Sequence, residues 1–160
     1  MNPSQWGAVA EAAITLEAVK LDIPVWRPVA EGGRYDLVFE LHGQLLRVQC
    51  KIARRRGAVI NVAARTSRRV RGGYLRGTYT PDEIDAVAAY CPENDRSYLI
   101  PIAKIPRSGW FSLRLAPAKN NQKRGLNWAS EYELGAIAQL GERVTGSHEV
   151  AGSSPASSTF

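Results

Sequence analysis

Apolar and polar positions follow two different periods along this chain. Over residues 4–21 the apolar side chains recur about once per helical turn, which predicts an amphipathic helix capped by Ser4. Glu11 and Glu17 interrupt the apolar face of this helix. Shorter apolar runs bounded by glycine or proline then predict β-strands. These runs cover residues 23–27, 35–41, 45–51, 59–63, 98–102 and 110–115.

Other segments lack a clear period. Residues 65–77 contain arginines and glycines without alternation, which predicts a loop that is mobile without its partner. Thr80 followed by Pro81 has the form of a helical start, and residues 84–91 fit either a helical turn or a strand. Residues 118–132 form a polar, basic segment. The order of helix, strands, short helix and strands predicts an α/β domain with a central mixed β-sheet flanked by helices.

The composition is that of a globular protein. Hydrophobic residues make up 44% of the chain and charged residues 22%. No apolar run approaches the roughly 18 to 20 residues that cross a bilayer, so we expect a cytoplasmic protein without membrane contact. Cys50 and Cys91 give no disulfide framework, and His42 and His148 lack a second ligand at zinc spacing.

The charge is unevenly distributed. The formal net charge is +6, and the stretch from Lys51 to Arg76 holds nine basic residues and no acidic one. A solubilising surface is one interpretation. Solvated faces normally mix both signs, however, so a phosphate-binding surface is favoured.

Polar side chains gather at one end of the predicted hairpin formed by residues 35–41 and 45–51. Asp36 begins an apolar strand and faces away from its neighbour Leu37. Gln49 and Lys51 lie two residues apart on the partner strand, so they share one face of the sheet. Asp36 and Lys51 could form an ordinary cross-strand salt bridge, or the three groups could form a reaction site.

Phosphodiester hydrolysis needs a hard divalent cation, and oxygen atoms are its preferred ligands. The candidate ligands are the Asp36 carboxylate, the Gln49 amide oxygen and the Cys50 backbone carbonyl. Lys51 would orient or deprotonate the attacking water. Glu11 would complete the site from the first helix, with Glu17 as the alternative. The expected cofactor is Mg²⁺, with Mn²⁺ as a substitute.

Five blocks of this sequence resemble the PD-(D/E)xK nuclease superfamily, and more closely its small endonucleases associated with group I introns. The blocks are GAVAE from Gly7, RYDLV from Arg34, VQCK from Val48, YTPDEID from Tyr79 and KNNQKR from Lys119. The resemblance covers roughly residues 1–135. Residues 136–160 are then a C-terminal extension, and the small polar residues of 151–160 predict disorder at its end.

The resemblance implies a restriction-endonuclease-like core and magnesium-dependent cleavage of DNA. It makes Asp36 the metal-binding aspartate, Lys51 the motif lysine and Glu11 the acidic residue of the helix. Gln49 departs from the usual Asp or Glu. The amide lowers the negative charge of the site, which weakens the case for a second tightly bound metal.

Double-stranded DNA is the expected partner, because the basic stretch directly follows Lys51. Cutting both strands with so small a chain favours a homodimer or homotetramer. The predicted DNA-binding residues are Arg54, Arg55, Arg56, Arg65, Arg68, Arg69, Arg71, Arg76, Lys119, Asn120, Lys123 and Arg124.

The predicted function is that of a site-specific intron homing endonuclease acting on duplex DNA at the nucleoid. The segment 149–155 can be back-translated into a sequence like the T-arm of a transfer RNA gene, as a mobile intron element would produce. A chance low-complexity tail is the alternative for that segment. The functional alternatives are a structure-selective nuclease of the Holliday junction resolvase type and a catalytically inactive nucleic-acid-binding protein.

Overall fold

The first helix, α1 (Pro3–Lys20), begins one residue earlier than the predicted segment 4–21. Asn2 is its cap: the Asn2 side chain accepts a hydrogen bond from the Gln5 backbone N–H at 2.9 Å, and the Gln5 side chain accepts one from the Asn2 backbone at 2.8 Å. The prediction that Ser4 caps the helix is therefore wrong. Pro3 lacks an N–H and suits the first helical position, which places the cap before it.

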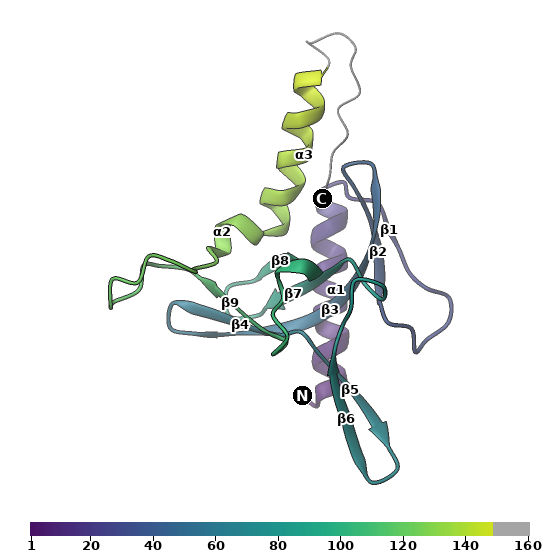
Figure 1. Ribbon diagram of the computed structural model, residues 1–160. Coiled ribbons are helices and arrows are strands. Elements are labelled where there is room, and N and C mark those ends of the chain that lie inside the picture. The colour runs from purple at the N-terminus through teal and green to yellow at the C-terminus, as the bar shows by residue number, and fades with distance from the viewer. Residues whose placement is uncertain (149–160) are drawn as a thin grey trace.

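The computed structural model describes the backbone of residues 1–148 and the side chains of residues 1–67 and 70–141. The predicted disorder of residues 151–160 and the back-translated segment 149–155 lie outside the described residues. Figure 1 shows α1 lying along one face of the central sheet. Within the described part of the chain, no helix is long and apolar enough to cross a membrane.

The central sheet is mixed, as predicted. Neighbouring strands run antiparallel except for β3 and β7, which are parallel, with Gln49 opposite Val87 and Lys51 opposite Ala89. The strands in spatial order are β1 (Val25–Trp26), β2 (Leu37–Leu41), β3 (Gln44–Arg56), β7 (Ala86–Cys91) and β8 (Arg96–Pro101).

Strand β3 is longer than the predicted residues 45–51 and pairs with different partners along its length. Its last residues pair with β4 (Val59–Ala63), and β4 pairs with β9 (Trp110–Arg114). Residues 54–56 of this extension are exposed arginines, so the extension shows no alternation of apolar and polar residues that would predict a strand. Gly57, with a φ of 59°, closes the turn between β3 and β4.

Two apolar clusters lie on opposite faces of the central sheet. On one face Ala10, Ile14 and Ala18 of α1 pack against Val48 and Cys50. On the other, the inward side chains of β4 and β9 pack with Val87 and Ala89. Because side chains alternate along a strand, Gln49 and Lys51 lie on the face opposite α1.

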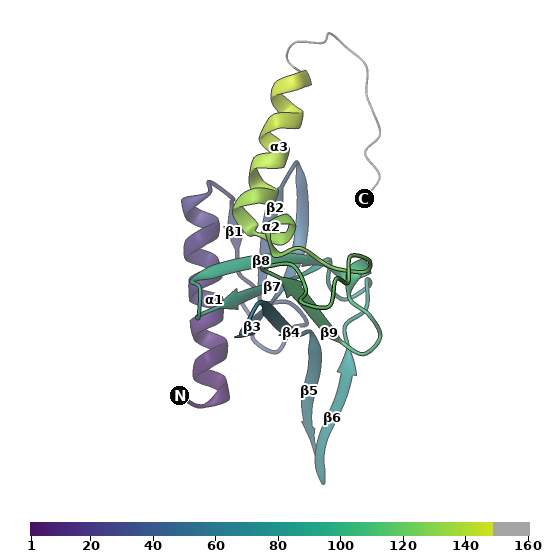
Figure 2. The same ribbon diagram turned by 90° about the vertical axis from the view of Figure 1, so that its left-hand side faces the viewer.

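Residues 65–78 form a hairpin of β5 (Arg65–Val70) and β6 (Gly73–Thr78), so the predicted mobile loop is wrong. Figures 1 and 2 show this ribbon projecting away from the rest of the domain. The whole of β6 is exposed, and a strand without a buried face has no reason to alternate apolar and polar residues. Gly72 and Gly73, with φ values of 100° and 150°, allow the turn.

The predicted helical start at Thr80 is also wrong, because the chain makes a turn there before β7. The Arg47 guanidinium donates hydrogen bonds to the backbone carbonyls of Pro81 at 2.9 Å and Asp82 at 2.5 Å. It also pairs with the Asp85 carboxylate at 3.0 Å. These two carbonyls therefore accept hydrogen bonds from Arg47 of the neighbouring strand β3 and not from backbone N–H groups of a helix.

After the short 3-10 helix Ile102–Lys104 and β9, the last two described elements are the helices α2 (Ala129–Tyr132) and α3 (Leu134–His148). Leu134 is buried against the α1 cluster, with Ile137 packed beside it. The Ile137 carbonyl lies 3.0 Å from Nε2 of His42, in the turn between β2 and β3. The first residues of the C-terminal extension therefore pack onto the domain, and the boundary at residue 135 stays a prediction.

Asn2→Ala tests the helix cap. Losing the side-chain acceptor should lower the free energy of unfolding by about 1 kcal/mol. Ser4→Ala is the matched control and should change it by less than about 0.5 kcal/mol, because Ser4 is exposed inside the first turn. Urea unfolding followed by circular dichroism measures both, and a larger loss for Ser4→Ala would contradict the assignment.

Candidate active site

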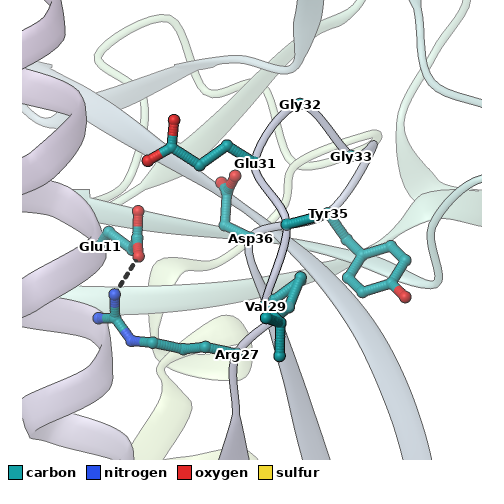
Figure 3. A pocket seen from close by; sticks show the side chains of 10 residues that line it. Glu11, Arg27, Val29, Glu31, Gly32, Gly33, Tyr35 and Asp36 are labelled. Atoms are coloured by element: carbon teal, nitrogen blue, oxygen red, sulfur yellow. Dashed lines mark hydrogen bonds and ion pairs between the residues drawn. The ribbon is translucent and has the colours of Figure 1, made fainter.

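A pocket of about 370 Å³ opens between α1 and the loop that joins β1 to β2. Figure 3 shows the carboxylates of Glu11, Glu31 and Asp36 directed into it, with the Arg27 side chain reaching toward Glu11. Tyr35 contributes to the wall, but its ring points away from the carboxylates. The pocket therefore joins three acidic groups and one guanidinium from two separate elements.

Asp36 occupies the step before β2 and is tied to β3 by both its backbone and its side chain. Its N–H donates to the Val48 carbonyl at 2.9 Å. Its Oδ2 accepts hydrogen bonds from the Cys50 N–H at 2.8 Å and from the Gln49 side-chain amide. Burial raises the pKa of Asp36, and the Cys50 N–H and the Lys51 charge partly oppose that rise. A half-buried carboxylate of this kind gains from a nearby cation.

The Gln49 amide is placed between two acceptors. Its Nε2 donates to Asp36 Oδ2 and, at 3.4 Å, to the Cys50 backbone carbonyl. The nitrogen and oxygen of such an amide exchange places by a half-turn of the side chain. In the reversed orientation the Gln49 amide oxygen would take the place of Nε2 beside the Asp36 carboxylate and the Cys50 carbonyl. Three such oxygens are a donor set that suits a hard divalent cation.

Lys51 projects from the same strand face as Gln49. Its Nζ lies 5.3 Å from the centroid of the Tyr79 ring. Burial lowers the pKa of Lys51, while the Asp36 carboxylate opposes that shift. Within the described residues the ammonium group makes no hydrogen bond or ion pair. The solvated cross-strand salt bridge between Asp36 and Lys51 is thus not the arrangement that forms.

The Cys50 side chain takes no part in the pocket. Its thiol is buried against α1, and burial together with the Asp36 charge raises its pKa far above the ordinary value. The thiol therefore stays protonated, and the backbone carbonyl is the chemically useful group of this residue.

Of the two acidic residues on α1, Glu11 faces the pocket and Glu17 does not. Glu11 Oε1 pairs with the Arg27 guanidinium at 2.5 Å. Glu17 Oε2 accepts a hydrogen bond from the Ser97 backbone N–H at 3.0 Å, which binds α1 to β8. The geometry therefore favours Glu11 over Glu17 as the helix-borne acidic group.

The predicted DNA-binding arginines of β3 are not equivalent. Arg54 stacks on the Trp6 ring at 4.2 Å and pairs with Glu93 at 3.7 Å, so it is engaged within the domain. Arg55 donates to the Gly57 carbonyl at 2.8 Å. Arg56 is exposed at the strand end.

The remaining predicted DNA-binding residues lie on two projecting segments. On the hairpin, Arg65 is opposite Thr78 and Arg76 is opposite Ser67, so Arg65 and Arg76 share one face. Arg68 and Arg69 lie in β5, and Arg71 lies at the turn. The other segment is the exposed loop between β9 and α2, with Lys119, Asn120, Lys123 and Arg124.

Three residues of this region were not predicted. Glu31 and Arg27 line the pocket, but both lie in a stretch where sequence pattern gives no side-chain direction. The Tyr79 ring lies beside the Lys51 ammonium. Tyr79 is the first residue of the YTPDEID block, and this place in the block was the one sequence feature that could have indicated a role for it.

The mixed sheet, with α1 across one face and the pocket beside the start of β2, is a restriction-endonuclease-like α/β fold. The sequence matches the PD-(D/E)XK endonuclease family over residues 1–135, and the chain belongs to that family.

A solved structure described as a bacterial homing endonuclease, I-Ssp6803I, has the same fold. It is 22% identical, with a TM-score of 0.64 over 92% of this chain and 99% of that chain. No curated protein sequence matches this chain.

Asp36→Asn tests the electrostatic cost of this site. Because the folded-state pKa of Asp36 is raised, its ionisation destabilises the protein as pH rises through that pKa. The variant should therefore be more stable at neutral pH without divalent metal, by on the order of 1 kcal/mol.

Thermal melting with and without Mg²⁺ is the measurement. The stability gain should shrink as pH falls toward 3.8, the ordinary aspartate value, and Mg²⁺ should raise the melting temperature of the wild type only. Equal stabilisation of both proteins by Mg²⁺ would place the metal elsewhere.

Proposed function

We propose that this protein is a Mg²⁺-dependent endodeoxyribonuclease that hydrolyses phosphodiester bonds in duplex DNA as a site-specific homing endonuclease, with Mn²⁺ as a substitute metal. The observation that carries the proposal is the contact of the Asp36 carboxylate with both the Gln49 amide and the Cys50 backbone, beside a pocket that Glu11 shares. Membership of the PD-(D/E)XK endonuclease family supports it.

Asp36, the reversed Gln49 amide, the Cys50 carbonyl and Glu11 are the groups that would hold the divalent cation. When bound, the cation neutralises the charge that develops on the phosphate oxygens and lowers the pKa of water. Since Gln49 is neutral, the set carries one negative charge fewer than the usual acidic ligands of this family. A single tightly held cation therefore fits better than two.

Lys51 supplies the second kind of chemistry. Burial lowers its pKa, so its amine gives up a proton more readily than an exposed lysine does. It can orient the attacking water and stabilise the added negative charge at phosphorus. Attack by this water breaks the bond from phosphorus to the 3′ oxygen, and proton transfer to that oxygen leaves a 3′-hydroxyl and a 5′-phosphate.

The β5–β6 hairpin is the element we assign to DNA contact. It projects from the domain in both views, and no acidic residue occurs between Lys51 and Arg76. A two-stranded ribbon of this kind fits the major groove. The width of the major groove, which admits a two-stranded ribbon, and the exposed arginines of the hairpin together support its binding to duplex DNA.

Homing requires cleavage of both strands, which favours a homodimer or homotetramer, each copy supplying one site. The similarity of the fold to I-Ssp6803I, a bacterial homing endonuclease, supports this proposal.

Lys51→Ala tests the catalytic assignment. Removing a positioned cationic group from the reacting phosphate should lower single-turnover cleavage by about 10²-fold or more. Binding of the same DNA in Ca²⁺, measured by anisotropy, should change little. Unchanged cleavage by both Lys51→Ala and Asp36→Asn would show that the site assignment is wrong.

A second candidate function is favoured by Gln49: a nucleic-acid-binding protein that has lost cleavage. Wild-type protein that binds duplex DNA but never cleaves it in Mg²⁺ or Mn²⁺ would select this candidate. A resolvase-type nuclease would instead cleave four-way junctions in preference to linear duplexes, whatever their sequence. Parallel assays with both substrates separate the three functions.

Arg71→Gln combined with Arg76→Gln tests the hairpin. Each lost phosphate contact should reduce the slope of log affinity against log salt by about 0.9. A control pair must remove the same charge elsewhere, and Arg96→Gln with Lys20→Gln does so on exposed positions away from the hairpin. Anisotropy titrations across a salt series measure the slopes. Equal slopes for the two double variants would reject the hairpin as the DNA-binding element.

A further inference from the structure

Arg27 lies at the wall of the candidate active site and holds one of its acidic groups. It follows β1 directly and turns back toward α1. Its Nη1 pairs with Glu11 Oε1 at 2.5 Å, and its Nη2 donates to Thr15 Oγ1 at 3.2 Å. Figure 3 shows this pair beside Asp36 in the same pocket. One guanidinium thus joins two positions one helical turn apart on α1.

This pair does little for the fold. The Arg27 side chain is 54% exposed and that of Glu11 is 30% exposed. Exposed ion pairs add little to folding stability, because water screens them and the side chains lose freedom. The position of Arg27 therefore calls for another explanation.

The charges of the pocket explain the position of Arg27. The Arg27 charge is among those that lower the pKa of Asp36, so its field reaches both candidate metal-binding carboxylates. A guanidinium paired with a carboxylate offsets its negative charge and occupies part of its acceptor capacity, so it opposes binding of a metal ion to the same group. The phosphate of DNA is the other group that a guanidinium binds well, through two parallel hydrogen bonds.

We propose that Arg27 competes with the divalent cation for Glu11, and that it binds the scissile phosphate once the cation has displaced it. The inference rests on the proposed nuclease function. It predicts that metal and DNA bind cooperatively, because phosphate takes Arg27 away from Glu11 and frees that carboxylate for the metal. Arg27 would then add a positive charge on the phosphate side, opposite Lys51.

Arg27→Gln separates this role from a structural one, because it should improve metal binding while it slows the reaction. Mn²⁺ affinity without DNA, measured by electron paramagnetic resonance, should rise roughly two- to fivefold, the competition expected of a half-exposed ion pair. Single-turnover cleavage at saturating Mn²⁺ should fall about 10²-fold, as for loss of one positioned donor to the transition state.

Arg96→Gln is the matched control. Arg96 pairs with Glu133, and the exposures of that pair, 60% and 34%, are close to those of Arg27 and Glu11. Its Mn²⁺ affinity and cleavage rate should equal those of the wild type. Arg27→Lys retains the charge but cannot contact Glu11 and Thr15 together, so both of its effects should be intermediate. Arg27→Lys also allows the same measurements if Arg27→Gln fails to fold.

Three results decide the matter. Mn²⁺ binding by Arg27→Gln that is equal to or weaker than wild-type binding overturns the competition. Unchanged cleavage at saturating Mn²⁺ overturns the phosphate role. Tighter Mn²⁺ binding by Arg27→Gln, with no cleavage by any protein including the wild type, supports the competition and shows that the proposed nuclease function has failed.

Discussion

The hydrogen bond from the Cys50 N–H to the Asp36 carboxylate is the interaction on which the site depends. The neighbouring backbone bond from Asp36 to Val48 belongs to the register of β2 and β3. Side-chain alternation along β3 then turns Cys50 toward α1 and places Gln49 and Lys51 on the other face. The positions of the candidate catalytic groups are therefore set by the same ladder that forms the sheet, and a shift of one residue would separate them.

This arrangement carries an electrostatic cost that other contacts offset. Burial raises the pKa of Asp36 and lowers that of Lys51, so at neutral pH both charged groups are less stable than they would be in water. Nearby, Arg47 fixes the turn of residues 80–85 through Asp85, whose pKa it holds below the ordinary value. That turn directly follows Tyr79, whose ring lies beside the Lys51 ammonium. The Arg47–Asp85 pair thus fixes the turn that follows Tyr79, next to the candidate site.

The sequence alone was sufficient to predict those features that follow from the regular alternation of side chains along a strand. The apolar alternation around Asp36 and the spacing of Gln49 and Lys51 place these side chains as the structure has them. The hairpin of residues 65–78 could not be predicted in this way, because β6 buries no face and so shows no alternation of apolar and polar residues. Arg27 and Glu31 reach the pocket through the path of the loop between β1 and β2, and no short-range pattern specifies that path.

The charge balance of the pocket connects these observations. Glu11 is compensated by Arg27, and the Lys51 charge acts on Asp36, while Gln49 adds no charge. Glu31 also lines the pocket and makes no ion pair among the described residues. The described residues contain no cluster of three acidic, histidine or cysteine side chains suited to a metal ion. Two of the three carboxylates that line the pocket thus have a positive side chain near them without any bound cation. The neutral Gln49 and the positive Arg27 both reduce the attraction of the pocket for cations, so occupancy of the proposed metal site would depend on a negatively charged partner. Duplex DNA, the proposed substrate, is negatively charged, and metal loading would then be strongest where that substrate is present.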